Sequence, residues 1–181
     1  DGIRDRDVTG VQTCALPIYF RWILIGRLAA TGQMTRAEID TEAAADVTAA
    51  GVRNAAAARA ALPAMDSKQA AWSAILGDLE MSNEVLEATV AGFMGMDQAE
   101  LVAGFTDAYF SALPAVWAER SNEIAQTITT GLFPSLQFTQ ETIDKANEFL
   151  ATVDVPFGCK RLVGEGRDAL VRALKAQAAD S

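Results

Sequence analysis

The chain has 181 residues and contains no histidine. Histidine is the commonest metal ligand and general base near neutral pH. Its absence excludes H-E-x-x-H zinc sites, Ser-His-Asp triads and Cys-His pairs from this chain. Cysteine is also scarce, since only Cys14 and Cys159 occur. Two cysteines do not indicate a disulfide framework, and they are compatible with a reducing cytoplasm.

Long apolar runs and an excess of positive charge are missing as well. No run reaches the roughly 18 apolar residues that indicate a transmembrane helix. The net charge is −9, from 15 basic and 24 acidic residues, and no basic patch is visible. Affinity for nucleic acid rests on neutralising phosphates. We therefore expect neither a membrane nor a nucleic acid as a partner.

Residues that interrupt helices are few. The chain has 5 prolines and 13 glycines, aromatic residues make up 7%, and half of all residues are hydrophobic. Alanine supplies much of that half, and it is the best helix former and allows close helix packing. The composition predicts an all-α fold.

Residues 1–18 differ in style from everything that follows. They show neither a helical nor a strand period, and three acidic residues and two arginines crowd the first seven positions. The segment resembles a translated sequencing adapter, and the alternative is an ordinary disordered N-terminal tail. We therefore expect the structural domain to comprise residues 19–181, and the natural protein to begin upstream.

Apolar residues after position 19 recur with the helical period. We expect roughly nine helices, which cover residues 19–30, 35–45, 48–62, 66–79, 82–93, 97–113, 121–132, 139–150 and 156–174.

Start and stop signals set these boundaries. Thr35 with Glu38, and Asp97 with Glu100, have the spacing of a capping box. Gly32 is expected to stop the first helix, and Pro114 to open a new segment. Further caps are expected at Thr48, at Asp66 or Ser67, and at Ser82, Ser121 and Thr139.

Short loops place successive helices antiparallel. Trp22, Trp72 and Trp117 are separated by 50 and 45 residues, which is near the period of two-helix HEAT or armadillo repeats. The spacing could equally be a coincidence. A curved stack of antiparallel helix pairs, a HEAT/armadillo-like α-superhelix, nevertheless explains the pattern better than a compact bundle.

Several segments together resemble the C-terminal helical domain of bacterial aminopeptidase N, which is related to the C-terminal domain of the endoplasmic-reticulum aminopeptidases. The segments are Q-A-A-W-S-A-I-L, L-E-A-T-V-A-G-F, Y-F-S-A-L-P-A-V-W-A-E-R-S-N-E-I-A and G-L-F-P, in that order. The alanine-rich residues 46–61 and the closing residues 161–177 also fit. The resemblance covers about residues 19–181.

This resemblance implies a non-catalytic part of a zinc metallo-aminopeptidase that removes N-terminal residues from peptides. In such enzymes a separate catalytic domain holds the zinc, and the helical domain forms a wall or lid that controls access to the active-site chamber. The implied partners are that catalytic domain and peptide substrates. The expected location is cytoplasmic, in keeping with the scarce cysteines. The G-F-M-G-M segment at residues 92–96 lacks the glutamate and asparagine of the family's G-x-M-E-N loop, so we interpret it as a helix end.

The candidate site residues are Glu119, Arg120 and Glu123, near an expected helix start at Ser121. They could line the substrate chamber or meet another domain. Capping and surface pairing is the simpler interpretation, because carboxylates are favourable near a helix N-terminus.

Other candidates also have simpler structural interpretations. Lys160, Arg161 and Arg167 could face a peptide carboxylate, or they could form a solvated helix face. Trp72 and Trp117 are expected to be core anchors rather than ligand platforms. No histidine is available to activate Cys159.

Two other functions remain open. A stand-alone helical-repeat scaffold that binds another protein would need polar outer faces on both terminal helices, and the apolar residues 19–25 argue against that. A ligand-sensing domain of a regulator would need a helix-turn-helix with a basic face, which the sequence does not show.

Overall fold

The computed structural model describes residues 17–179. These residues form ten α-helices and one short 3-10 turn, with no strand among them. In chain order the elements are α1 (Ile18–Ala30), α2 (Arg36–Ala45), α3 (Ala49–Ala61), α4 (Met65–Gly77), α5 (Asn83–Phe93), η1 (Met96–Gln98), α6 (Ala99–Ala103), α7 (Thr106–Glu119), α8 (Asn122–Gly131), α9 (Gln140–Thr152) and α10 (Phe157–Ala179).

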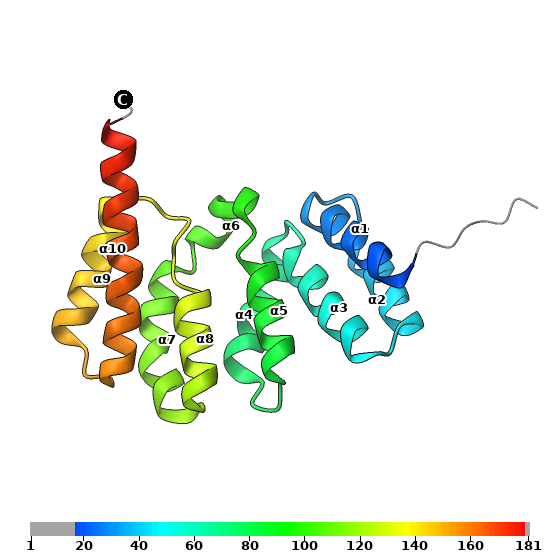
Figure 1. Cartoon of the computed structure of the whole chain (residues 1–181), viewed down its shortest axis with the longest axis horizontal. Helices are drawn as coiled ribbons and strands as arrows, with labels where there is room; N and C mark the ends of the chain where they lie inside the picture. The colour runs from blue at the N-terminus through cyan, green and yellow to red at the C-terminus, as the bar shows by residue number, and fades with distance from the viewer. Residues whose placement is uncertain (1–16, 180–181) are drawn as a thin grey trace, which may run out of the picture.

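The helices stand side by side in a curved row (Figure 1). The pairs α4/α5, α7/α8 and α9/α10 follow one another along the row, and α1, α2 and α3 form the opposite end. The predicted all-α stack of helix pairs is confirmed, and the ten helices are close to the expected number. Residues 1–16, and with them most of the segment that resembles an adapter, lie outside the described residues.

Most of the predicted helix starts and stops are confirmed. Thr35 and Glu38 form a reciprocal capping box: the Glu38 amide donates to the Thr35 hydroxyl, and the Glu38 carboxylate accepts from the Thr35 amide. The predicted caps at Thr48, Ser82, Ser121 and Thr139 all accept a backbone N–H of the following helix. Gly32 follows the end of α1 with φ +71°, a left-handed conformation that glycine adopts without steric cost.

The predicted start and end of the fourth helix are wrong. The helix begins at Met65, and its N-cap residue, Ala64, makes no side-chain cap. Asp66 lies in the first turn and accepts the amide of Ser67. The helix ends at Gly77, so Leu79 leaves the apolar face and is 62% exposed. Apolar periodicity continued past this end because it reports side-chain spacing and not backbone termination.

The single helix expected over residues 97–113 is divided. Asp97 lies in the 3-10 turn, and neither this turn nor α6 has a side-chain cap, so the second capping box does not form. The helical conformation is interrupted between α6 and α7, at Gly104 and Phe105. Pro114 does not open a segment but lies inside α7. A proline there removes one helical hydrogen bond, which packing of the surrounding helix must offset.

Buried apolar residues form two clusters. The large cluster runs through α3–α10 and includes Ile75, Leu86, Tyr109 and Leu170. The small cluster joins α1, α2 and α3, and it includes Trp22, Ile39 and Leu62. Because α3 contributes to both clusters, it connects the first three helices to the rest of the stack.

The alanine-rich helix α3 packs very closely against α5. At Gly92 an added Cβ atom would lie 2.1 Å from the backbone oxygen of Ala57. No side chain can therefore stand at this position unless the two helix backbones separate. This contact gives a packing reason for Gly92, the first glycine of the G-F-M-G-M segment. The helix α5 ends within this segment, at Phe93, as expected.

We expect Gly92→Ala to lower the free energy of unfolding by about 1–3 kcal/mol, which is typical of overpacking in a tight interior. Gly164→Ala is the matched control, because an added Cβ on Gly164, inside α10, meets nothing within 4 Å. The control should stabilise the chain by about 0.5–1 kcal/mol through helix propensity. Urea unfolding followed by circular dichroism measures both values, and equal effects of the two substitutions would contradict the close approach of α3 and α5.

Candidate functional site

Arg120 holds the end of another helix. Its guanidinium donates to the backbone oxygens of Ile75 at 2.9 Å, Leu76 at 3.1 Å and Asp78 at 2.8 Å. These carbonyls lie at the C-terminal end of α4, where a helix lacks internal donors and favours positive charge. Arg120 therefore connects the α7–α8 turn to α4.

Glu119 and Glu123 lie beside Arg120 in sequence but do not share its role. Glu119 is the last residue of α7, Glu123 is in the first turn of α8, and both side chains are exposed. Neither carboxylate pairs with Arg120, whose guanidinium is taken up by α4. The three candidate residues thus divide into one structural arginine and two carboxylates that face solvent.

Two of the three basic candidates on α10, Arg161 and Arg167, are paired locally. Arg161 forms an ion pair with Glu165 at 2.5 Å, one turn along the helix. Arg167 pairs with Asp168 at 2.7 Å and donates to the side-chain oxygen of Asn147 on α9 at 3.1 Å. These contacts favour the interpretation of a solvated helix face.

Trp72 and Trp117 both pack against the large core. Trp72 lies with Phe93 and Phe105 in an aromatic cluster with ring centroids 5.1–5.8 Å apart. Trp117 donates its indole N–H to the Thr129 hydroxyl at 2.8 Å. Both are placed as core anchors, although their surroundings differ.

Cys159 is fully buried, and burial raises the pKa of its thiol to about 11. A thiol with a raised pKa is mostly protonated at neutral pH, so it is a poor nucleophile and metal ligand. Among residues 17–179, no group of three or more His, Cys, Asp or Glu side chains is placed to hold a metal ion. The described residues therefore do not supply a ligand set for zinc.

Lys68 is the residue that sequence reasoning missed. Its side chain is completely buried, and its ammonium donates to the backbone oxygens of Ala60 at 2.7 Å, Phe93 at 3.0 Å and Gly92 at 3.3 Å. These carbonyls belong to the C-terminal ends of α3 and α5. A signal was present, because Lys68 precedes Trp72 and Ile75 by four and seven residues and so lies on the apolar face of its helix.

Gln98 has the same role at a neighbouring junction. Its amide nitrogen donates to the backbone oxygens of Ala30, at the end of α1, and Ala61, at the end of α3, at 2.9 and 2.7 Å. Its buried side-chain oxygen has no hydrogen-bond partner in the described stretch of the chain.

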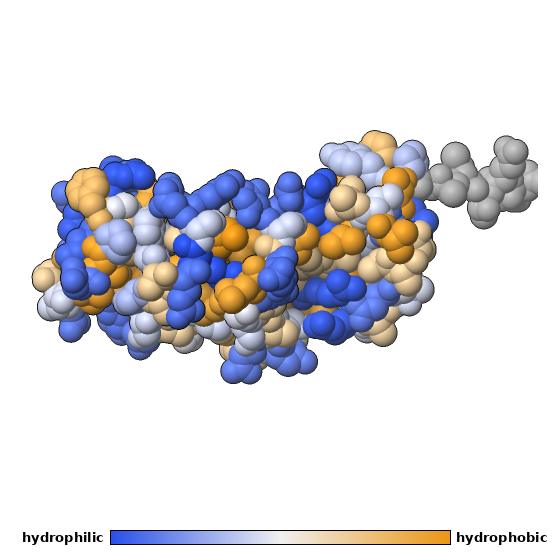
Figure 2. Space-filling view, turned by 90° about the horizontal axis from the view of Figure 1, so that it is seen from below, coloured by the Kyte–Doolittle hydropathy of each residue, from blue (hydrophilic) through white to orange (hydrophobic). Residues whose placement is uncertain are grey.

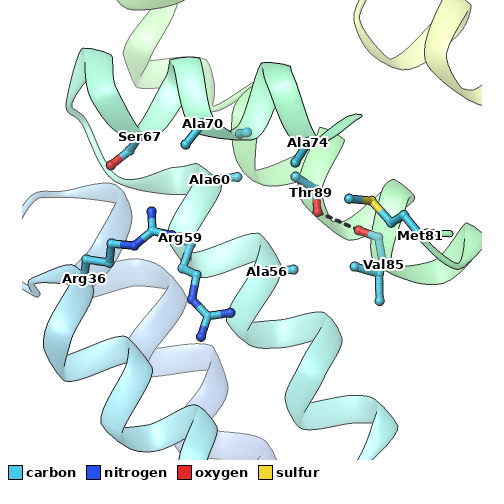
Figure 3. A pocket seen from close by; sticks show the side chains of 11 residues that line it. Arg36, Ala56, Arg59, Ala60, Ser67, Ala70, Ala74, Met81, Val85 and Thr89 are labelled. Carbon is cyan, nitrogen blue, oxygen red and sulfur yellow. Dashed lines mark hydrogen bonds between the residues drawn. The ribbon is translucent and has the colours of Figure 1, made fainter. Parts of the chain in front are cut away.

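A small cavity of about 160 Å³ lies among α2, α3, α4 and α5. Figure 3 shows Arg36 and Arg59 near one another at one side, and alanines of α3 and α4 around the hollow. The Arg59 guanidinium is paired with Asp40 at 2.6 Å. The cavity is well below the roughly 300–1,000 Å³ of small-molecule sites, so we assign it no ligand.

The geometry defines a class of protein: a helical-repeat domain whose polar side chains tie helix to helix, with no metal cluster in residues 17–179. None of the described helices is long and apolar enough to cross a membrane. The chain belongs to the ERAP1-like C-terminal domain family, whose model matches residues 5–172. That match begins inside the segment 1–18, whose origin as an adapter stays a prediction.

A similar curated protein is an aminopeptidase N from Streptomyces lividans. The two are 44% identical over 180 residues, which cover 98% of this chain and 21% of the relative. The predicted resemblance to the C-terminal domain of a bacterial aminopeptidase N is confirmed. The chain spans about a fifth of the length of that relative.

We expect Arg120→Met to destabilise the chain by about 1–3 kcal/mol, because it leaves carbonyls at the end of α4 without donors. The neighbouring substitution Glu119→Gln should change the free energy of unfolding by less than about 0.5 kcal/mol, as is usual for exposed sites. Chemical unfolding of the purified variants measures both. If Arg120→Met were as stable as the parent chain, the role of Arg120 at the end of α4 would be disproved.

Lys68 should make the free energy of unfolding depend on pH in the alkaline range. Burial lowers its pKa from 10.5 to about 8 in the folded chain. At a pH between these two pKa values, Lys68 is protonated in the unfolded chain and mostly neutral in the folded chain. The unfolded chain then binds more protons than the folded chain. The contribution of Lys68 to the free energy of unfolding therefore rises as the pH increases from about 8 to about 10. The difference in unfolding free energy between the parent chain and Lys68→Met should grow with a slope of at most about 1.4 kcal/mol per pH unit.

Burial acts in the opposite direction on Tyr109 and Cys159, whose pKa values it raises. Both residues are present in both proteins, so their contributions cancel in this difference. Unfolding curves at several pH values provide the measurement. Parallel stability profiles for the two proteins would show that Lys68 keeps its ordinary pKa in the fold.

Proposed function

We propose that this chain is a non-catalytic part of a zinc metallo-aminopeptidase that removes N-terminal residues from peptides, and that it forms a wall that limits access to the active-site chamber. The observation that carries this proposal is the family match over residues 5–172 together with 44% identity to an aminopeptidase N. The catalytic domain of the parent enzyme and its peptide substrates are the proposed partners, and the cytoplasm is the proposed location.

The zinc belongs to the remainder of the parent enzyme in this proposal. The described residues offer no cluster of metal ligands, and Cys159 is buried with a raised pKa. The contribution of this chain is therefore shape and rigidity rather than chemistry. A wall must keep its curvature under contact with substrate, and the side-chain bonds of Lys68, Gln98 and Arg120 to neighbouring helix ends support that property.

Glu119 and Glu123 are the residues that we propose to face the chamber or the adjoining domain. Both carboxylates are exposed, and they flank a turn that Arg120 fixes to α4. The alternative of a stand-alone interaction scaffold is less well supported, because the outer side of α1 is apolar.

The chain alone should neither bind zinc tightly nor cleave aminoacyl amides. A chimera in which this chain replaces the matching fifth of the Streptomyces lividans enzyme should hydrolyse a small aminoacyl amide and discriminate against bulky peptides. The readout is the ratio of kcat/KM for the two substrates, compared with a chimera that carries both Glu119→Gln and Glu123→Gln. Peptidase activity of the isolated chain would refute the non-catalytic assignment. A chimera that folds but cleaves bulky peptides as readily as small amides would refute the role in access.

A further inference from the structure

A groove of about 410 Å³ runs between α7 and α9. Its floor is apolar, because Phe110 and Phe149 pack together there with ring centroids 5.7 Å apart, and Pro114 lies beside them. Along α7 the groove extends from Asp107 to Pro114, which is about 10 Å for seven residues of helix. Its volume falls within the range of sites that bind small molecules.

The two hydroxyl groups that line this groove already donate their hydrogen atoms elsewhere. Ser111 donates to the backbone oxygen of Asp107 at 2.9 Å, and Thr152 donates to that of Glu148 at 2.7 Å. A hydroxyl has one donor and two acceptor lone pairs. Both hydroxyl oxygens can therefore accept a hydrogen bond from a ligand, but they have no donor left to offer it.

The charged groups at the groove are mostly acidic. Lys145 also lines it, and its ammonium is paired with Asp107 at 2.6 Å and with Glu141 at 2.8 Å. The Glu148 carboxylate lies one turn further along α9 and has no hydrogen bond or ion pair with the part of the chain that the structure describes. An anionic ligand at the remaining N–H of Lys145 would lie beside these carboxylates, whereas a cationic ligand meets a free one.

The proline inside α7 adds one more acceptor. Pro114 has no N–H, so the backbone carbonyl of Phe110, four residues earlier, lacks the donor that a regular helix would give it. Both residues line the groove. The rim thus offers oxygen acceptors above an apolar floor, which is the arrangement that suits N–H donors carried on an apolar chain.

Ligands of other chemistry fit the groove less well. A divalent metal ion needs several oxygen ligands at once, and no group of three or more His, Cys, Asp or Glu side chains in residues 17–179 is placed to hold one. A peptide segment brings a backbone acceptor with nearly every donor, so its carbonyl groups would face oxygens. On the face seen in Figure 2, hydrophobic residues at the α7–α10 end of the stack lie among hydrophilic ones. A ligand at this end therefore needs both an apolar and a polar part.

We propose that the groove between α7 and α9 binds a linear aliphatic polyamine. Its alkyl segments lie on Phe110, Pro114 and Phe149, where an ammonium group can also approach an aromatic face. One ammonium group donates to the Glu148 carboxylate, and the others donate to the oxygens along the rim. A protonated amine has no acceptor of its own, so no polar atom of the ligand is left unpaired. This site is independent of the proposed function, which assigns no ligand to these helices.

An NMR titration of the chain with spermidine tests the proposal. Backbone amide signals of α7 and α9 should shift and saturate, with a Kd on the order of 1 mM for a ligand of this size. Glu148 is exposed, and Glu148→Gln keeps the size of the side chain but removes its charge. This substitution should weaken binding at least about five-fold, because a hydrogen bond to a charged group becomes one to a neutral group.

Glu165→Gln is the matched control. It makes the same change of charge at the rim of another groove of about 410 Å³, between α8 and α10. At about 0.15 M salt, where exposed charges act over short distances, the control should change the Kd by less than about two-fold.

Four results would overturn the proposal. The first is the absence of saturable shifts in α7 and α9. The second is an equal response to Mg²⁺ at matched ionic strength, which would show general attraction of cations to an acidic chain. The third is equal weakening by Glu148→Gln and Glu165→Gln, which would show that net charge and not this groove binds the amine. The fourth is tighter binding of Nα-acetyl-lysine amide than of spermidine, which would assign the groove to a lysine side chain of a peptide.

Discussion

Backbone carbonyl groups at the C-terminal ends of α1, α3, α4 and α5 lack donors within their own helices, and side chains from other elements supply them. Lys68 reaches the ends of α3 and α5, Gln98 those of α1 and α3, and Arg120 that of α4. A carbonyl without a partner in a junction between packed helices is unfavourable by about 1–3 kcal/mol. Each of these side chains therefore fixes where one helix ends relative to another.

Packing of small residues adds a second constraint near the start of the stack. The alanines of α3 allow its backbone to approach α5 so closely that only glycine fits at position 92. Ala55 and Ala58 of the same helix pack toward the small cluster, and Ala60 belongs to the large one. A helix with larger side chains could not serve both cores at this spacing.

The two ends of the molecule differ in the polarity of their outer helix faces. Charged and amide side chains cover the outside of α9 and α10, whereas α1 carries an apolar stripe on each of two sides. The terminal layer of a helical stack needs a polar outer side to remain soluble.

The amino-acid sequence determined the helices themselves, because caps and periodicity act within one or two turns. The capping box of Thr35 and Glu38, the stop at Gly32 and four further caps could be predicted from neighbouring residues alone. The absence of histidine likewise excludes catalysis that uses a histidine side chain of this chain. Tertiary structure alone decided the division of residues 97–113, the interior position of Pro114 and the roles of Lys68, Gln98 and Arg120. Arg120 donates to carbonyls that lie 42–45 residues away in the chain, and a contact at that separation leaves no periodic trace in the sequence, because its partner is the backbone, which every residue shares.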